Sequence, residues 1–476
     1  MEKCRMTMPG LLLLLAEVVV VAVLALVASA HFGVSDGLRI TVAFLVAYLV
    51  PLFLLKHVNG TSDAAHAVLL LIAVFMSVVA YDCLVTWSAP EGYSLQRPNL
   101  VGDARAYYKL ALYEYDRSTD YEGVVFPGFS LMILITWKLF GLSVIWPQAM
   151  NMMFTMMSVV FTGMLTRRVL SHRISLSPKT LVLSAMLLMC LLMFYLTSGV
   201  TILKEGFTFL SIAMGGYALS SMVAADDERQ HPWHDIILFV IACVLMAIVR
   251  TTFLYFLALG VIIMALPHWR RDWVLALCFL ALIALLMVVG NYFAAYSFNR
   301  HAEIVDGGWN MQRAFNTDKA YNKSFLGFYF LYSPWHRLLM LPITMGMQFI
   351  LPFPHPWIPA PPSDEPYMLC IFTRMTYGWY VFGGTALFYC LFVSWRRHDN
   401  IGVWPWWPVI AYMGLAYVMG GAMARYMLPF QPLMVPMALY VLYRVYHGRW
   451  RKSYIIWIVA ILLIMIAASY YYHEMR

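Results

Sequence analysis

Long apolar runs separated by short polar connections make up most of this chain. A run of about 20 apolar residues is long enough to cross a bilayer as an α-helix. About 13 such runs can be placed, at residues 10–30, 38–55, 66–87, 144–166, 178–198, 201–224, 235–250, 251–267, 272–297, 367–395, 403–421, 425–445 and 453–472. The pattern predicts an all-α polytopic membrane protein with about 13 transmembrane helices, forming a single membrane domain over residues 1–476.

Two apolar stretches, the long stretch 235–267 and the first run, allow more than one assignment. The stretch 235–267 is too long for one span and has Arg250 in its middle, where a charge is costly in lipid, so we predict shorter helices that meet near Arg250. The first run follows Lys3 and Arg5, as in a signal peptide, but it continues to Ala30. The apolar part of a signal peptide is only about 7–15 residues long. We therefore expect a transmembrane helix that starts on the inside.

Short basic connections indicate the orientation of the chain. They contain Arg167, Arg168, Arg173 and Lys179; Arg270 and Arg271; Arg396 and Arg397; and Arg444, Arg449, Arg451 and Lys452. Basic loops remain on the cytoplasmic side, and an inside N-terminus places all of these loops there. The long segments 88–143 and 298–366 then form two outer loops. Each contains a short apolar stretch, 126–140 or 338–351, in which we expect an interfacial or re-entrant helix.

The composition agrees with a lipid environment and excludes several other classes. Hydrophobic residues make up 62% of the chain and charged residues 12%, against roughly 25% charged residues in soluble domains. The net charge of +8 is explained by cytoplasmic loops, and no nucleic-acid partner is predicted. The 7 cysteines show no metal-binding or disulfide spacing. No ligand motif is present for a divalent metal, so no cofactor is predicted and a metal requirement is left open.

Polar residues at or just below the predicted outer face supply the candidate chemistry. They are Asp103, Arg105 and Lys109 in the first outer loop, Lys204 and Glu205 after a short outer turn, Arg250 at a helix junction, and Arg425 and Tyr426 at a helix start. Lys and Arg can hold a phosphate group, and a carboxylate can take a proton from an attacking hydroxyl. The pattern predicts a site that uses lipid-linked phosphate.

Several short motifs follow one another in a recognisable order. They are Asp103-Ala-x-x-Tyr107, Phe126-Pro127-Gly128, Leu139-Phe140-Gly141, Thr166-Arg167-Arg168, Ser198 to Glu205, Val249-Arg250-Thr251-Thr252 and Ala424 to Pro429. In this order the chain resembles the GT-C superfamily of membrane glycosyltransferases, which includes protein O-mannosyltransferases and the aminoarabinose transferase of lipid A. The resemblance covers residues 66–446.

The resemblance implies transfer of a sugar from a polyprenyl- or dolichyl-phosphate carrier to an acceptor outside the cytoplasm. It matches Asp103 to the essential acid of the family and Arg425 to a phosphate-binding position. The chain departs from the family pattern in three ways: Ala104 stands where many members carry a second acid, residues 1–60 add two helices before the first family helix, and the Asp-x-Asp motif of oligosaccharyltransferases is absent.

Simpler structural roles compete with each assignment. Asp103 can cap an interfacial helix, and Arg105 and Lys109 can bind membrane lipid headgroups. Lys204 and Glu205 can pair with each other, although an anion is favoured at a helix N-terminus. Arg250 and Arg425 can be structural or interface anchors. Asp116, Asp120 and Glu122 suit a solvated face, and His336 and Arg337 are weaker candidates for substrate contact.

These residues predict a glycosyltransferase of the bacterial inner membrane, working on cell-envelope glycans at the periplasmic or exterior face. Asp103 would activate an acceptor hydroxyl on a glycan, lipid or protein, and the sugar would leave its polyprenyl-phosphate carrier with inversion. A polysaccharide polymerase or ligase would use similar carriers and cations. A secondary transporter or lipid flippase is the alternative from another class, although such proteins place their polar residues at the membrane midplane.

Overall fold

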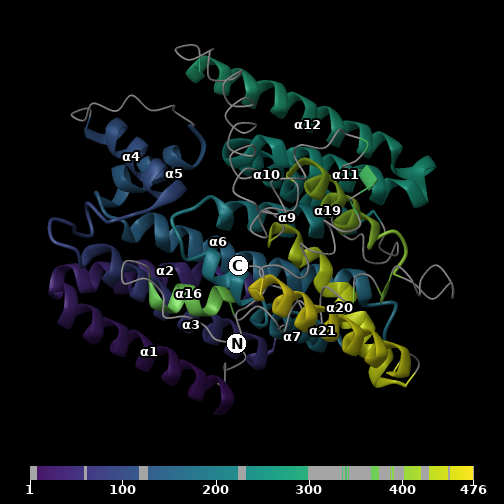
Figure 1. Cartoon of the computed structure of the whole chain (residues 1–476), viewed down its shortest axis with the longest axis horizontal. Helices are drawn as coiled ribbons and strands as arrows, with labels where there is room; N and C mark the ends of the chain where they lie inside the picture. Colours follow the sequence, from purple (N-terminus) through teal and green to yellow (C-terminus); the bar gives the residue numbers. More distant parts are fainter. Residues whose placement is uncertain are drawn as a thin grey trace, which may run out of the picture.

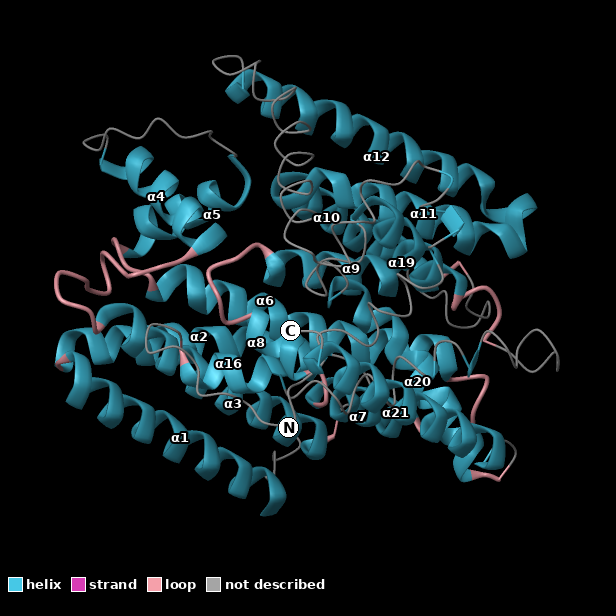
Figure 2. Ribbon diagram, viewed as in Figure 1, coloured by secondary structure: helices cyan, strands magenta, loops and turns pink. Residues whose placement is uncertain are grey.

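Every regular element in the described part of the chain is a helix, and that part contains no strand (Figure 2). The computed structural model describes residues 8–57, 62–116, 127–222, 232–298, 366–374, 401–419, 428–448 and 451–474, together with residues 335, 338, 339, 341, 386, 389 and 390. Most of the predicted second outer loop, 298–366, lies outside the described residues.

The helices follow the hydrophobic pattern closely. Their bounds are α1 (Met8–Phe32), α2 (Val34–His57), α3 (Asp63–Ser88), α4 (Gly102–Asp116), α5 (Pro127–Phe140), α6 (Ile145–Leu170), α7 (Pro178–Cys190), α8 (Met193–Ser198), α9 (Glu205–Ser220), α10 (Pro232–Arg250), α11 (Leu254–Ala265), α12 (Trp269–Phe298), α16 (Tyr367–Arg374), α19 (Trp406–Met419), α20 (Gln431–Tyr446) and α21 (Arg451–Glu474). The 3₁₀ turns η2 (Thr251–Phe253) and η3 (Leu266–His268) flank α11.

Six stretches of the described chain are long and apolar enough to cross a membrane. They are Met8–Phe32, Val34–His57, Asp63–Ser88, Ile145–Leu170, Trp233–Arg250 and Leu254–Gly290. This is the architecture expected of an integral membrane protein, and it confirms the all-α prediction. The number of spans, about 13 by the sequence pattern, stays a prediction.

The structure divides two of the predicted runs differently. A helix break near Arg250 was expected, and α10 indeed ends at Arg250 before the turn η2 and helix α11. The run 178–198, expected as one span, is split into α7 and the short α8, because the chain turns at Leu191 and Leu192. Within the apolar stretch 126–140, residues 127–140 form helix α5, and its interfacial or re-entrant position in an outer loop stays a prediction.

Helix α6 lies at the centre of the molecule, whereas α1 and α12 run along opposite edges (Figure 1). α6 contacts α2, α3, α5, α7, α9 and α20. Most of its length is buried by these neighbours, while α1 packs mainly on α2 and α3 among the described helices and leaves most of its apolar surface exposed. The core is therefore built around α6 and α9.

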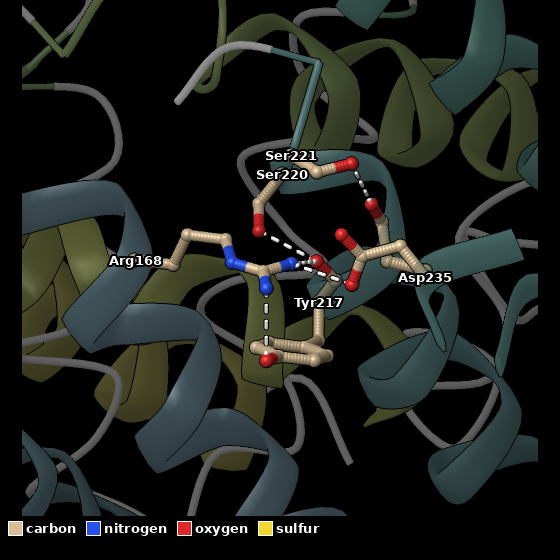
Figure 3. A network of polar contacts seen from close by, with 6 residues as sticks. Arg168, Tyr217, Ser220, Ser221 and Asp235 are labelled. Atoms are coloured by element: carbon tan, nitrogen blue, oxygen red, sulfur yellow. Dashed lines mark hydrogen bonds and ion pairs between the residues drawn. The ribbon is translucent and has the colours of Figure 1, made fainter. Parts of the chain in front are cut away.

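A largely buried ionic network joins the end of α6 to α9 and α10 (Figure 3). Arg168 Nη1 donates to Asp235 Oδ1 at 2.8 Å and to the Tyr217 carbonyl at 3.1 Å, and Nη2 donates to the Tyr217 hydroxyl at 2.9 Å. Arg168 lies in the last turn of α6 and Asp235 in the first turn of α10, so each charge also faces the helix end that favours it. The network fixes the relative positions of these helices.

Arg168→Gln should destabilise the protein strongly, because it leaves Asp235 buried without its cation. Breaking a buried pair costs about 3–5 kcal/mol. The matched control is Arg39→Gln, since Arg39 pairs with Asp36 at 3.1 Å but half of its side chain, 50%, is exposed. That exposed pair should contribute less than about 1 kcal/mol. Unfolding of the purified protein in mixed micelles measures both values, and equal losses would contradict the structural role of Arg168.

Candidate functional site

Helix α4, which carries Asp103, is held against α5 by aromatic side chains. The buried Tyr108 donates to the Gln96 carbonyl at 2.8 Å and packs edge-on against Trp137, with ring centroids 4.7 Å apart. Trp137 Nε1 in turn donates to the Ser143 carbonyl at 2.9 Å. Burial raises the pKa of the Tyr108 hydroxyl, which therefore stays protonated and keeps its donor role.

Lys204 of the loop before α9 meets Tyr107 of α4. Its Nζ lies 5.6 Å from the centre of the Tyr107 ring, a cation–π arrangement. Phe129 at the start of α5 packs edge-on against Tyr107 on one side, at 5.5 Å, and against Phe207 of α9 on the other, at 5.9 Å. The beginnings of α4, α5 and α9 thus meet at one place.

The loop that carries Lys204 is fixed by Asn151 of α6. The Asn151 side-chain amide donates to the Thr201 carbonyl at 2.7 Å and to the Leu203 carbonyl at 2.5 Å. A Cβ at Gly206 would lie 2.7 Å from the Asn151 carbonyl oxygen, so only glycine allows the first turn of α9 to approach α6 this closely. These contacts set the position of Lys204 and of the adjacent, fully buried Glu205.

Arg250 comes to the same region from the last turn of α10. Only 8% of it is exposed, and its guanidinium lies over the Phe253 ring at 4.4 Å. The close contact between Gly128 and the Ile248 carbonyl, where a Cβ would lie 2.4 Å away, brings the start of α5 against this last turn. Arg250 therefore lies beside the helix start that also contacts Tyr107.

Burial separates the predicted site residues into two groups. Lys204 is half-buried and Glu205 and Arg250 are buried, whereas Asp103 is exposed in the first turn of α4. Because Asp103 precedes Tyr107 by one helical turn, both lie on the face of α4 that meets Lys204. The site thus combines a half-buried and a buried cation with an exposed carboxylate.

The remaining predicted residues are not brought into this group. Arg105 and Lys109 are exposed and, at about 100° per residue, lie on the other side of α4 from Asp103. They are available to solvent or lipid headgroups, and their carrier-binding role stays a prediction. Arg425 and Tyr426 lie outside the described residues, as do Asp120, Glu122, His336 and Arg337.

Polar groups inside apolar helices were missed by the sequence analysis. Glu17, Tyr48 and His66 form a hydrogen-bonded cluster between α1, α2 and α3. Asp82 of α3 accepts the backbone N–H of Met368 at 2.8 Å, in the first turn of α16. Isolated charges within otherwise apolar runs were the available signal.

The described residues contain no group of three or more His, Cys, Asp or Glu side chains suited to hold a metal ion. No protein-family model, curated protein or solved structure matches this chain.

Asn151→Leu should loosen the loop that carries Lys204, because two part-buried carbonyls lose their donor. The expected cost is about 1–3 kcal/mol. Amide hydrogen exchange over residues 199–206 should accelerate. Gln148→Leu is the matched control, since Gln148 lies one turn earlier on α6 and donates at 3.3 Å to Ala80, away from this loop. Unchanged exchange in Asn151→Leu would show that the loop is held by other contacts.

Proposed function

We propose that this chain is a membrane glycosyltransferase of the GT-C type. It moves a sugar from a polyprenyl-phosphate carrier to an acceptor hydroxyl, at the outer face of a bacterial inner membrane. The observation that carries the proposal is the contact between Lys204 and Tyr107. The contact supports the proposal because Tyr107 lies one helical turn after Asp103, so that Lys204 meets the helix of Asp103 although the two residues lie about 100 positions apart in the sequence.

In this mechanism the buried side of the site holds the carrier phosphate. Lys204 is the N-cap residue of α9, where the helix dipole and the first backbone N–H groups favour an anion. Arg250 adds a second cation in surroundings of low polarity, where its attraction for a phosphate is strong. Arg425 and Tyr426 complete the phosphate contacts in this proposal.

The exposed side of the site activates the acceptor. Asp103 takes the proton of the acceptor hydroxyl, and the oxygen attacks the anomeric carbon opposite the carrier phosphate. The bond between the anomeric carbon and the phosphate oxygen breaks, and its electron pair leaves with the phosphate. The sugar is transferred with inversion, and the cations stabilise the negative charge that grows on the leaving group.

Asp103→Asn tests the proposed base, because Asn keeps the size and the capping ability of Asp but cannot take the proton. Turnover should fall about 10²- to 10⁴-fold while carrier binding stays near normal. Asp116→Asn at the opposite, exposed end of α4 is the matched control and should leave turnover unchanged. The measurement is sugar transfer from polyprenyl-monophosphate sugars in proteoliposomes. Near-normal turnover in Asp103→Asn would overturn the assignment of the base.

Lys204→Gln tests the proposed carrier site. Loss of a charge-assisted contact costs about 1.5–3 kcal/mol, so affinity for the polyprenyl-phosphate sugar should fall about ten- to hundredfold. Lys138→Gln is the matched control. Lys138 belongs to α5, and its Nζ lies 4.9 Å from the ring centre of Tyr115, which is on α4 like Tyr107. Equal affinity in the two variants would show that Lys204 only packs on Tyr107. Turnover with a diphosphate-linked oligosaccharide alone would instead favour the polymerase alternative.

A further inference from the structure

A second polar centre lies between α1, α2 and α3, apart from the candidate glycosyltransferase site. Glu17 Oε1 accepts from the Tyr48 hydroxyl and from His66 Nε2, the latter at 2.7 Å. The Tyr48 hydroxyl is also 2.8 Å from His66 Nε2. Each residue comes from a different apolar helix, and such groups are costly in lipid and usually mark a site.

One oxygen of Glu17 is left available by this arrangement. Both of its hydrogen bonds end on Oε1, and among the described residues no group donates to Oε2. The Glu17 side chain is 18% exposed. A carboxylate oxygen in apolar surroundings gains free energy from a hydrogen-bond donor, and the described residues around it supply none.

Glu17 also lines a cavity of about 80 Å³ between the three helices. The cavity extends from Glu17 to Leu24 along α1, which is about 10 Å at the rise of an α-helix. Aliphatic and aromatic side chains form most of its wall: Val20, Val21, Phe44, Leu45, Leu70 and Val74. Its shape and lining suit the end of an apolar chain.

The polar end of the cavity is placed as the polar end of a lipid would be. His66 lies in the first turn of α3, and the cavity continues along α3 from Leu70 to Ser77, away from that helix end. In a bilayer, the carboxylate therefore lies closer than the rest of the cavity to the membrane side where α1 and α3 start, with Glu17 the tenth residue of α1. α1 exposes most of its length to lipid, so an occupant can come from the bilayer itself (Figure 1).

We propose that this cavity binds an uncharged, hydroxyl-headed bilayer lipid, a long-chain alcohol or an acylglycerol, whose hydroxyl donates to Glu17 Oε2. Near Glu17 the lining hydroxyls already donate within the protein, Tyr48 to Glu17 and Thr41 to the Gly37 carbonyl at 2.8 Å. Among the described residues near Glu17, a phosphate head would find a carboxylate and no hydroxyl free to donate, so the site should reject it. This proposal does not depend on the glycosyltransferase function, whose candidate residues lie on other helices.

The test is photolabelling of the full-length protein in lipid nanodiscs. The probe is decanol with a diazirine at the end of its chain, and the labelled residues are identified by peptide mass spectrometry. Decyl phosphate and decylamine carrying the same diazirine are the comparison probes. Decanol should label residues of α1, α2 and α3 around the cavity, at least about tenfold more than decyl phosphate does, and excess unlabelled decanol should compete.

Two neighbouring variants of α1 separate cavity binding from general lipid contact. Val20 lines the cavity, whereas Val19 does not and is 59% exposed. Val20→Phe should reduce decanol labelling at least about tenfold, and Val19→Phe should leave it unchanged. Glu17→Gln keeps the shape but removes the charge, so decanol labelling should fall about fivefold and the difference from decyl phosphate should shrink.

Several results would overturn the proposal. Equal labelling in Val20→Phe and Val19→Phe, or labels spread over all lipid-facing helices, would show bulk lipid contact only. Equal labelling by decyl phosphate would refute selection by Glu17. Preferential labelling by decylamine would replace the hydroxyl lipid by a cationic one. Competition by a monoacylglycerol, stronger or weaker than by decanol, identifies which hydroxyl lipid is preferred.

Discussion

The structure depends on one helix: α6 is buried by protein on most of its length, and its polar side chains tie it to the segments around it. Its buried polar residues recur every three or four positions, at Gln148, Asn151, Thr155, Ser158, Thr162 and Thr166. Some of them bond across to neighbouring segments, as Gln148 does to the Ala80 carbonyl and Ser158 to the Tyr195 hydroxyl at 2.6 Å. Hydrogen bonds between helices are worth most in an apolar interior, so Gln148 ties α6 to α3 and Ser158 ties it to α8, whereas the Thr155 and Thr166 hydroxyls are buried without a hydrogen-bond partner among the described residues.

The same helix fixes both ends of α9. Near the start of α6, Asn151 holds the loop before α9, and near its end Arg168 bonds to Tyr217 in the last turns of α9. Arg168 also binds Asp235 at the start of α10. Because α10 is held at its first turn by Asp235 and contacts Gly128 at its last, the position of Arg250 follows from that of α6. Lys204 and Arg250 are thus placed by a rigid framework of buried contacts.

The sequence alone predicts which residues form helices better than it predicts how they meet. Apolar runs indicate α1, α2, α3 and α6, and the charge within the run 235–267 correctly indicates the break at Arg250. The turn at Leu191 and Leu192 has no such signal, since both residues are apolar and good helix formers. Short helices such as α7 are therefore merged with their neighbours in any prediction from hydrophobicity.

The candidate site shows the same limit. Polar motifs indicated Lys204, Glu205 and Arg250, because charges next to apolar runs are rare. The contact of Lys204 with Tyr107 and the approach of Arg250 to the start of α5 depend on Gly128, Gly206 and Asn151, whose close contacts are properties of pairs of helices. The cluster of Glu17, Tyr48 and His66 was missed because its hydrogen bonds also join different helices. In the sequence, each of the three residues is an isolated polar group in a long apolar run.

Under the proposed function, the carrier and the acceptor would reach the candidate site from different sides, because its residues differ in burial. A carrier lipid reaches the protein through the bilayer, and its phosphate needs cations in surroundings where their charge is little screened. Lys204 and Arg250 satisfy this condition, because the first is half-buried and the second has only 8% of its surface exposed. An acceptor hydroxyl on a glycan arrives from water, and the exposed Asp103 is accessible from that side. Tyr107 contacts both Phe129 and Lys204, so under the proposed function the sugar would lie against these aromatic rings.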